Sequence, residues 1–238
     1  MSIYQTSCRL KNKDVNMYRK LRTSTLFEML QEISIAHTEE LGAGREKTLD
    51  HGFLWVIMQQ EVKIHSLPEY DDEITVSSWP GTTMHVLFPR YYQIHDSKGN
   101  LLVEGSALWA LIDHQTRKMI FPDKNGISVP GEQHGNEYPL PQRINAEECE
   151  QQQEFKVPFS YCDLNGHMNN TRYFDLFDDL FATRSPQPVL IRAEYHHEAR
   201  CYDRLQLHYN TENGSSYLEG SVDDQLCFRM KVNHESQD

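Results

Sequence analysis

The chain has 238 residues, a formal net charge of −12 and 38% hydrophobic residues. This length fits one large domain or two domains of ordinary size. The acidic balance disfavours nucleic acid as a partner, because binding to phosphates usually requires a basic surface. The five cysteines are odd in number and form no CxxC pair. This argues against a disulfide framework or a zinc knuckle and favours a reducing compartment.

The first ten residues contain no apolar stretch of the kind found in signal peptides. The most apolar run, 101–112, is interrupted by Glu104 and is too short to cross a bilayer. We therefore expect a cytoplasmic protein that does not enter a membrane, and we expect neither a cofactor nor a metal.

The first half of the chain predicts one short strand, one helix and four longer strands. The helix is expected from Thr25, because Thr25-Leu26-Phe27-Glu28 fits a capping box, and its apolar residues recur at helical spacing up to Gly42. The strands are expected at 4–10, 53–65, 73–79, 86–95 and 101–113, with a hairpin turn at 96–100. The last of these is almost continuously apolar, which is typical of a central strand.

Proline and glycine interrupt every regular pattern from 122 to 153, which predicts a surface linker. The order of elements then repeats. A strand is expected at 155–161, a helix at about 170–183, and strands at 189–198, 203–210, 216–222 and 226–232, with a turn at Asn213-Gly214.

This repeat predicts a double hotdog, an α+β fold in which each of two units wraps an antiparallel sheet around a helix. The expected units are 1–121 and 154–238, joined by the linker 122–153.

The stretch before the second helix holds Asp163, Asn165 and His167 at alternate positions. A neutral histidine can act as a general base near pH 7, a carboxylate can orient it or act alone, and an amide can hold a water or a carbonyl. Main-chain N–H groups at the helix start, near Asn169 and Asn170, could stabilise an oxyanion. The set therefore suits attack on an acyl carbonyl. The same residue types also form helix-capping loops, and spacing alone leaves both interpretations open.

The sequence gives less support to a nucleophilic cysteine or a metal site. Cys162 and His167 would face opposite sides of an extended segment, so we predict a structural role for Cys162, and Cys201 is isolated. His196 and His197 are adjacent on a predicted strand and would point apart, which disfavours a metal site there. Glu198, on the same predicted strand, needs a partner or a chemical task, and His167 is one such partner.

In these residues and in further motifs, the chain resembles the acyl-[acyl carrier protein] thioesterases, in particular bacterial relatives of the plant enzymes. The matching motifs extend over nearly the whole chain: Gln31 with His37, Leu41-Gly42, Trp55-Val56, Pro68, Trp79-Pro80, Arg90, Ser106-x-x-Trp109-x-x-Ile112-Asp113, Asp163-x-Asn165-x-His167-x-Asn169-Asn170-x-x-Tyr173 and Glu194-Tyr195-x-x-Glu198.

The resemblance implies a double hotdog fold and hydrolysis of the thioester between a fatty acyl chain and the phosphopantetheine arm of acyl carrier protein. It assigns catalytic roles to Asp163, Asn165, His167 and Glu198. Plant members carry a cysteine after the second acidic residue, where this chain has Ala199. A nucleophilic cysteine is therefore not required.

The implied partner is acyl carrier protein, and a homodimer is an open possibility. Because the carrier is acidic, a basic cluster is a candidate docking patch, with a solvated face as the alternative. The cluster consists of Lys11, Lys13, Arg19, Lys20 and Arg22.

The segment 16–25, before the first helix, has no Asp/Asn/His set, so we expect one active site per chain. The first half would then hold the acyl chain, with Met29, Ile33 and Trp55 as candidate wall residues; the alternative, favoured for each one taken singly, is that they are ordinary core residues. Two alternatives remain, an acyl-CoA thioesterase of the hotdog class and a non-catalytic acyl-binding hotdog protein. A hotdog dehydratase fits the motif spacing poorly.

Overall fold

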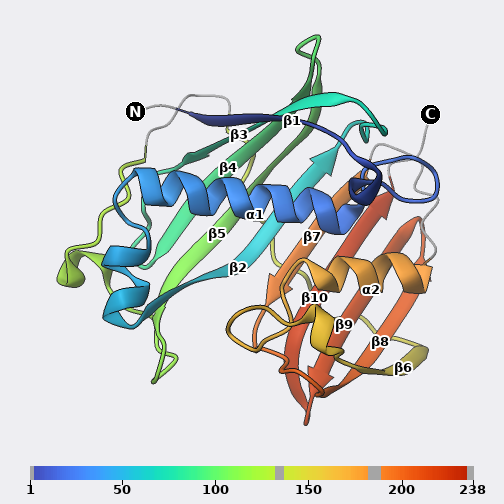
Figure 1. The fold of residues 1–238 in the computed structure, drawn as a ribbon. Helices are drawn as coiled ribbons and strands as arrows, with labels where there is room; N and C mark the ends of the chain where they lie inside the picture. The colour runs from blue at the N-terminus through green and yellow to red at the C-terminus, as the bar shows by residue number, and fades with distance from the viewer. Residues whose placement is uncertain (1–2, 132–136, 182–188, 235–238) are drawn as a thin grey trace.

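A computed structural model describes residues 3–131, 137–181 and 189–234. Its frame is one antiparallel sheet of ten strands in the order β1-β3-β4-β5-β2-β7-β10-β9-β8-β6. Helices α1 (Thr23–Glu40) and α2 (Arg172–Phe181) both lie on one face of this sheet (Figure 1).

The sheet is made of two consecutive sets of strands. The first half of the chain supplies β1 (Tyr4–Arg9), β2 (Phe53–Ile64), β3 (Glu73–Pro80), β4 (Leu87–Asp96) and β5 (Leu101–Asp113). The second half supplies β6 (Gln151–Lys156), β7 (Val189–Tyr195), β8 (Arg204–Glu212), β9 (Ser215–Val222) and β10 (Gln225–His234). The two sets join where β2 pairs with β7, with Gln59 opposite Glu194 and Ile64 opposite Val189. The predicted double hotdog is therefore confirmed.

Helix α1 forms because Leu26, Leu30, Ile33 and His37 recur every three or four residues and are all buried against the sheet. The predicted capping box is wrong. The helix begins at Thr23, and the N–H of Leu26 already donates to the carbonyl of Arg22 at 2.9 Å. The helix ends at Glu40, and Gly42 then takes the left-handed conformation, φ 73°, that favours glycine.

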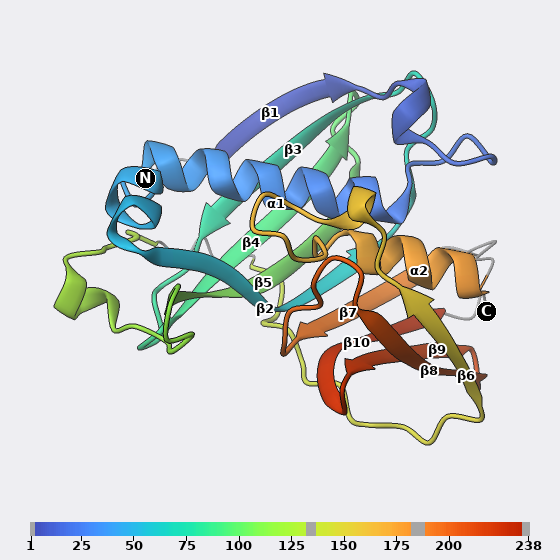
Figure 2. The ribbon, with the colours of Figure 1, turned by 60° about the horizontal axis from the view of Figure 1, so that its bottom comes forward.

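The two helices touch near their N-terminal ends (Figure 2). The rings of Phe27 and Phe174 stack with centroids 3.7 Å apart. Beside them, Arg172 of α2 forms an ion pair with Glu28 of α1 at 3.0 Å. The halves are therefore joined both through the sheet and through the helices that cover it.

Three predictions about the second half need correction. No strand covers 155–161: β6 ends at Lys156, and Pro158, which has no N–H to donate, precedes a 3₁₀ turn at 159–161. Helix α2 begins at Arg172 rather than near 170, and the predicted helical positions 182 and 183 lie outside the described residues.

The third correction concerns Glu198. Strand β7 ends at Tyr195, because the N–H groups of His196 and His197 both point to the carbonyl of Cys227 and the regular pairing stops. Glu198 is therefore in the loop that follows the strand.

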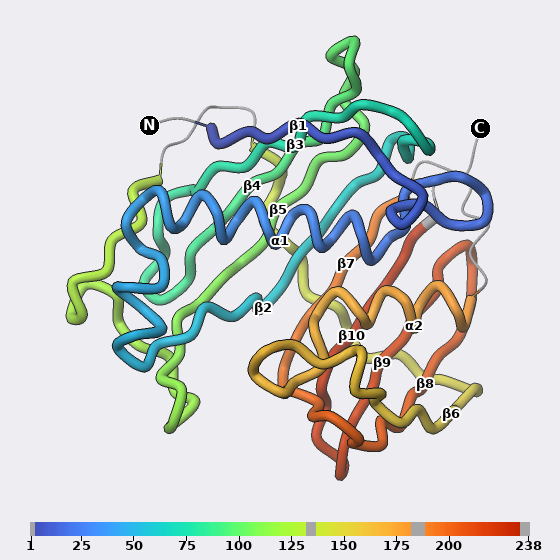
Figure 3. Tube along the Cα trace, viewed as in Figure 1, coloured from blue at the N-terminus to red at the C-terminus, as the bar shows by residue number. Residues whose placement is uncertain are grey.

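Residues 137–150 of the predicted linker cross the face of the sheet opposite the helices (Figure 3). The N–H of Gln142 donates to Glu61 at 3.0 Å and that of Ile144 to Glu194 at 3.0 Å. Both carboxylates belong to buried residues, on β2 and β7 respectively. This segment therefore covers the junction between the two halves, and β6 already begins at Gln151, inside the predicted linker.

Candidate active site

Three of the four candidate catalytic residues, Asp163, Asn165 and His167, lie on a tight loop of residues 162–168, here called the motif loop. The N–H of Asp163 donates to the carbonyl of His167 at 2.8 Å, and the N–H of Gly166 donates to the carbonyl of Asp163 at 3.0 Å. Gly166 has φ 76°, a conformation that costs glycine little. The turn leaves Leu164 and Asn165 at the tip of the loop, and Leu164 is 89% exposed.

The motif loop is anchored to the segment after β7. The N–H of Met168 donates to the carbonyl of Ala199 at 2.7 Å, and the N–H of Cys201 donates to the carbonyl of Gly166 at 3.2 Å. These bonds bring Glu198 beside the loop, with its Oε2 3.4 Å from Nδ1 of His167. This distance agrees with the predicted partnership of the two residues, while their catalytic role stays a prediction.

The contact between Glu198 and His167 sets the orientation of the imidazole. A carboxylate facing Nδ1 favours the tautomer that carries its proton there and leaves Nε2 as the acceptor. The second oxygen of Glu198, Oε1, accepts a hydrogen bond from the guanidinium of Arg117. Sequence reasoning missed Arg117, which comes from the turn after β5 and belongs to no recognised motif.

Asp163 and Asn165 form a second pair on the same loop. Oδ1 of Asp163 accepts the N–H groups of Asn165 and His167 at 2.8 and 3.3 Å, and the Asn165 amide lies 3.5 Å from Oδ2. In the described part of the chain, Asp163 meets His167 through the main-chain N–H and not through the imidazole. The carboxylate thus has a demonstrable role in shaping the loop, as the turn-forming interpretation of the sequence requires.

Asn169 forms a turn immediately before the second helix. Its side-chain oxygen accepts the N–H and the hydroxyl of Thr171, both at 2.9 Å, and its own N–H donates to the carbonyl of Tyr161 at 2.9 Å. Since the Asn169 N–H is already engaged, Asn170 remains the candidate oxyanion donor of the predicted pair.

Cys162 has the character of a structural residue. Its thiol is 3.7 Å from the carbonyl of Pro158, and burial, followed by the neighbouring Cys201 thiol, raises the pKa of Cys162 to about 11. A thiol with such a pKa is a poor nucleophile near neutral pH. This supports the structural role predicted for it.

A cavity of about 210 Å³ opens beside the motif loop. It lies between the later turns of α1, the start of β2, the start of β4 and the last part of β5. Leu164 and Asn165 also line it, so the motif loop forms part of its wall. Its apolar lining includes Trp55, Phe88, Trp109 and Val129.

One of the three predicted wall residues lines this cavity, and their role in holding an acyl chain stays a prediction. Trp55 lines the cavity, where its ring meets Phe88 edge-on and its indole N–H donates to the carbonyl of Ala43 at 3.1 Å. Ile33 is in the hydrophobic core and Met29 packs against it. Neither lines the cavity, because the cavity lies under the later turns of α1, from Ser34 onward.

Comparison with known proteins agrees with this architecture. Residues 1–123 match the family model of the acyl-ACP thioesterase N-terminal domain, and residues 144–236 match that of the acyl-ACP thioesterase C-terminal domain. The chain belongs to the acyl-ACP thioesterase family.

Named relatives of this family member come from plants. A dodecanoyl-[acyl-carrier-protein] hydrolase, chloroplastic, of Cinnamomum camphora is 22% identical over 238 residues, covering 90% of this chain and 61% of that protein. An acyl-[acyl-carrier-protein] hydrolase, FATB3, chloroplastic, of Cuphea viscosissima is 23% identical over 123 residues, covering 49% of this chain and 30% of that protein. The chain thus spans less than two-thirds of the length of these curated relatives.

Solved structures support the fold. An acyl-ACP thioesterase from Bacteroides thetaiotaomicron has a TM-score of 0.83 at 19% identity, with 98% of each chain covered. The 12:0-ACP thioesterase from Umbellularia californica also has a TM-score of 0.83, at 17% identity, covering 99% of this chain and 98% of that one. This family member therefore shares the double hotdog fold with both solved structures over nearly its whole length.

One wall of the cavity is polar. Arg90 of β4 is only 4% exposed, and its guanidinium donates to the hydroxyls of Ser78 and Thr38 at 3.1 and 3.0 Å and to Nδ1 of His37 at 3.2 Å. Burial, and then the charge of Arg90, lower the pKa of His37 to about 4. His37 is therefore neutral near pH 7, and Arg90 gives its ring a hydrogen-bond partner in this buried position.

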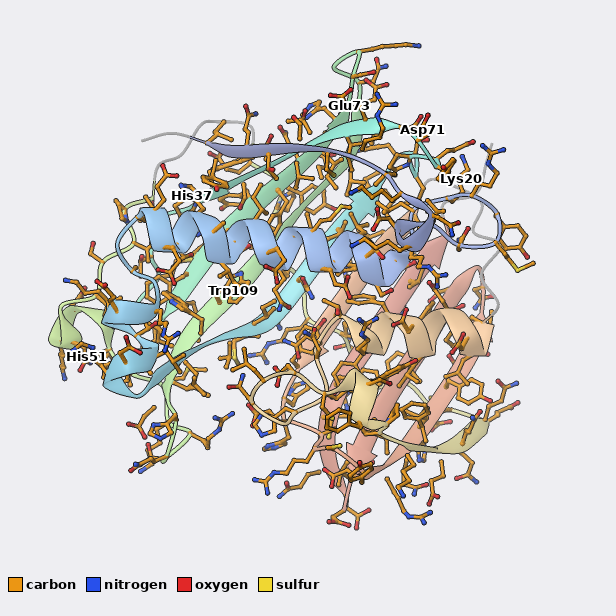
Figure 4. All side chains as sticks on the ribbon, in the orientation of Figure 1. Lys20, His37, His51, Asp71, Glu73 and Trp109 are labelled. Carbon is orange, nitrogen blue, oxygen red and sulfur yellow. The ribbon has the colours of Figure 1, made fainter. Side chains whose placement is uncertain are left out.

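The basic cluster lies at the opposite end of α1 from His37, as the position of Lys20 in Figure 4 shows. Lys20 pairs with Glu69 at 2.7 Å, Arg22 donates to the carbonyl of Val15 at 2.9 Å, and Arg19 lies over the ring of Tyr70. Lys11 and Lys13 are exposed. Docking of a partner on this cluster stays a prediction.

Two further observations concern metals and membranes. Among the described residues, no group of three His, Cys, Asp or Glu side chains could hold a metal ion. In the same part of the chain, no helix is long and apolar enough to cross a membrane.

Proposed function

We propose that this chain is a cytoplasmic thioesterase that hydrolyses fatty acyl-[acyl carrier protein] to a free fatty acid and holo-acyl carrier protein, without a cofactor. The observation that carries the proposal is the position of the motif loop. Asn165 lines a mostly apolar cavity, and two positions further His167 faces Glu198. An acyl chain in the cavity would therefore end next to a histidine and a carboxylate. The names of the plant relatives, both acyl-carrier-protein hydrolases, support the same substrate class.

The proposed reaction uses water as the nucleophile. Nε2 of His167 accepts a proton from water as the water oxygen bonds to the thioester carbon, while Glu198 stabilises the imidazolium through Nδ1. The oxyanion is stabilised by the amide of Asn165 and the N–H of Asn170. The carbon–sulfur bond then breaks, and the imidazolium returns its proton to the phosphopantetheine thiolate.

A second route would use Asp163 as the nucleophile, through an acyl anhydride that water then hydrolyses. The contacts of Asp163 favour the water route, because its Oδ1 already accepts two main-chain N–H groups of the motif loop. In the favoured route Asp163 keeps the loop in shape and adds negative charge near the imidazolium.

The test is a hydrolysis screen with the purified chain. Acyl groups of graded length are supplied on acyl carrier protein and, in parallel, on coenzyme A, while released thiol and free fatty acid are both quantified. We expect turnover of carrier-linked substrates that is faster than that of CoA-linked ones and depends on His167. Faster turnover of the CoA thioesters would indicate an acyl-CoA thioesterase instead. Binding of acyl chains without turnover would indicate a non-catalytic acyl-binding protein.

A further inference from the structure

The carboxylate of Glu198 is shared between the two halves of the chain. Its Oε2 lies 3.4 Å from Nδ1 of His167, in the second half. Its Oε1 accepts a hydrogen bond from Nη2 of Arg117, in the first half. Arg117, Glu198 and His167 thus form a continuous chain of charged and polar groups that ends at the proposed general base.

The turn that carries Arg117 is well defined by its own hydrogen bonds. Oδ1 of Asp113, the last residue of β5, accepts the N–H groups of Gln115 and Thr116 at 3.1 and 2.7 Å and the Thr116 hydroxyl at 2.8 Å. The N–H of Arg117 donates to the carbonyl of Asp113 at 2.9 Å. Arg117 itself has φ 58°, which is uncommon for a residue other than glycine. Such a conformation persists where the surrounding structure enforces it, and it is frequent at functional sites.

Because the ion pair between Arg117 and Glu198 is partly exposed, its effect on the orientation of Glu198 can be distinguished from its effect on stability. The side chains of Arg117 and Glu198 are 38% and 36% exposed. An ion pair in this environment adds little to the free energy of unfolding, because water screens the attraction. The ion pair has a larger effect on the orientation of the Glu198 side chain, because Glu198 is on a loop and the groups that it contacts determine that orientation.

We propose that Arg117 is a positioning residue for the hydrolysis proposed above. It holds Oε1 of Glu198 so that Oε2 faces His167, and it thereby fixes the imidazole with Nε2 directed to the reaction. The active site is then assembled from both halves of the double hotdog: the first half supplies Arg117 as well as the cavity. This inference rests on the proposed function for its kinetic consequences, but the orientation of His167 can be measured independently of turnover.

The kinetic test compares Arg117→Ala with Arg117→Lys and with Arg9→Ala as a matched control. Arg9 also forms an exposed ion pair, with Asp71 and Glu73, on the outermost strand β1. We expect Arg117→Ala to lower kcat roughly tenfold to a hundredfold, since displacement of a catalytic group by about an ångström costs on that order. KM and the melting temperature should stay near wild type, Arg117→Lys or added guanidinium should restore part of the rate, and Arg9→Ala should behave as wild type. An unchanged kcat in Arg117→Ala would overturn the proposal.

Two further measurements make the test specific. In a Glu198→Gln background, Arg117→Ala should cause little additional loss, because the two residues act through one contact; a full additional loss would contradict the assignment. Independently, the imidazole nitrogen signals of His167, assigned with His167→Gln, should shift in Arg117→Ala and not in Arg9→Ala. If wild type hydrolyses nothing, the proposed function fails while this spectrum still decides the positioning role. Unchanged His167 signals in Arg117→Ala would refute that role.

Discussion

Oε2 of Glu198 lies 3.4 Å from Nδ1 of His167, although 31 positions separate the two residues. The contact exists because the motif loop is bonded to Ala199 and Cys201, on either side of Arg200. A carboxylate at this position favours the tautomer that carries its proton on Nδ1 and leaves Nε2 as an acceptor, which is the form that the proposed mechanism requires.

Replacement of either member of this pair should remove most of the activity and leave the fold intact. His167→Ala removes the proposed general base, and Glu198→Gln removes the charge proposed to stabilise the imidazolium. We expect kcat to fall roughly 10²–10⁴-fold in each variant, the usual contribution of general acid–base catalysis. Both side chains are at least partly exposed, so thermal unfolding should stay within a few degrees of wild type. Substantial turnover by His167→Ala would exclude His167 as the base.

Asp163→Asn separates the two roles that Asp163 could have. Asparagine keeps a side-chain oxygen that can accept the N–H groups of Asn165 and His167, so the motif loop should keep its shape. It lacks the charge and cannot form the anhydride. We expect a drop in kcat of about tenfold in the water route, whereas the nucleophile route requires almost complete loss. Mass spectrometry of enzyme quenched during turnover provides the control, since an acylated Asp163 would be direct evidence for the nucleophile route.

The sequence predicts most strands and the position of α1 well, because alternation in strands such as 73–79 and helical spacing of Leu26, Leu30 and Ile33 are local signals. It fails at the ends of elements. The end of β7 depends on the carbonyl of Cys227, which is contributed by a strand about thirty positions away. The sequence therefore predicts Glu198 on a strand, whereas the structure places it in the loop that follows β7.

The candidate site shows the same limit. The Asp163, Asn165 and His167 set is contiguous and therefore visible in the sequence. Arg117 is not, since its contact with Glu198 depends on the pairing of β2 with β7 and on the turn after β5. The polar wall at Arg90 likewise requires β3, β4 and the last turns of α1 to meet. Contacts of this kind follow from tertiary structure and leave no periodic pattern.

Trp55 should limit the length of acyl chain that the cavity accepts. Trp55→Leu removes a large side chain from the wall, so longer acyl chains should gain in kcat/KM relative to shorter ones. Trp79→Leu is a matched control, because Trp79 is buried in the same half and does not line the cavity. Both variants should lose about 1–4 kcal/mol of stability, but only Trp55→Leu should change the chain-length profile. A profile that shifts equally in both variants would mean that the cavity does not hold the acyl chain.

His37 should make stability sensitive to mildly acidic pH. Its pKa falls from 6.5 to about 4 in the folded chain, because it is buried and adjacent to Arg90. The unfolded chain therefore binds a proton at His37 in a pH range where the folded chain does not. The stability that this group contributes is present above pH 6.5 and is lost as the pH falls from 6.5 toward 4. Urea unfolding at several pH values should show the difference between wild type and His37→Phe decreasing over this range, and a constant difference would contradict the burial of a neutral His37.

The basic cluster is tested by changing the charge of its exposed members. Because the chain carries −12 overall, an acidic carrier protein would be repelled unless it met a local positive surface. Lys11→Glu, Lys13→Glu and Arg19→Glu combined should raise KM for carrier-linked substrate about tenfold and leave KM for a short acyl-CoA unchanged. The matched control compares Lys13→Glu with Lys98→Glu, which makes the same change of charge in the exposed turn between β4 and β5. Only Lys13→Glu should affect the carrier-linked substrate. If Lys13→Glu and Lys98→Glu have equal effects, the carrier docks elsewhere. The same conclusion follows if the triple variant raises KM equally for both substrates. The exposed rim around Leu164 would then be the next surface to change.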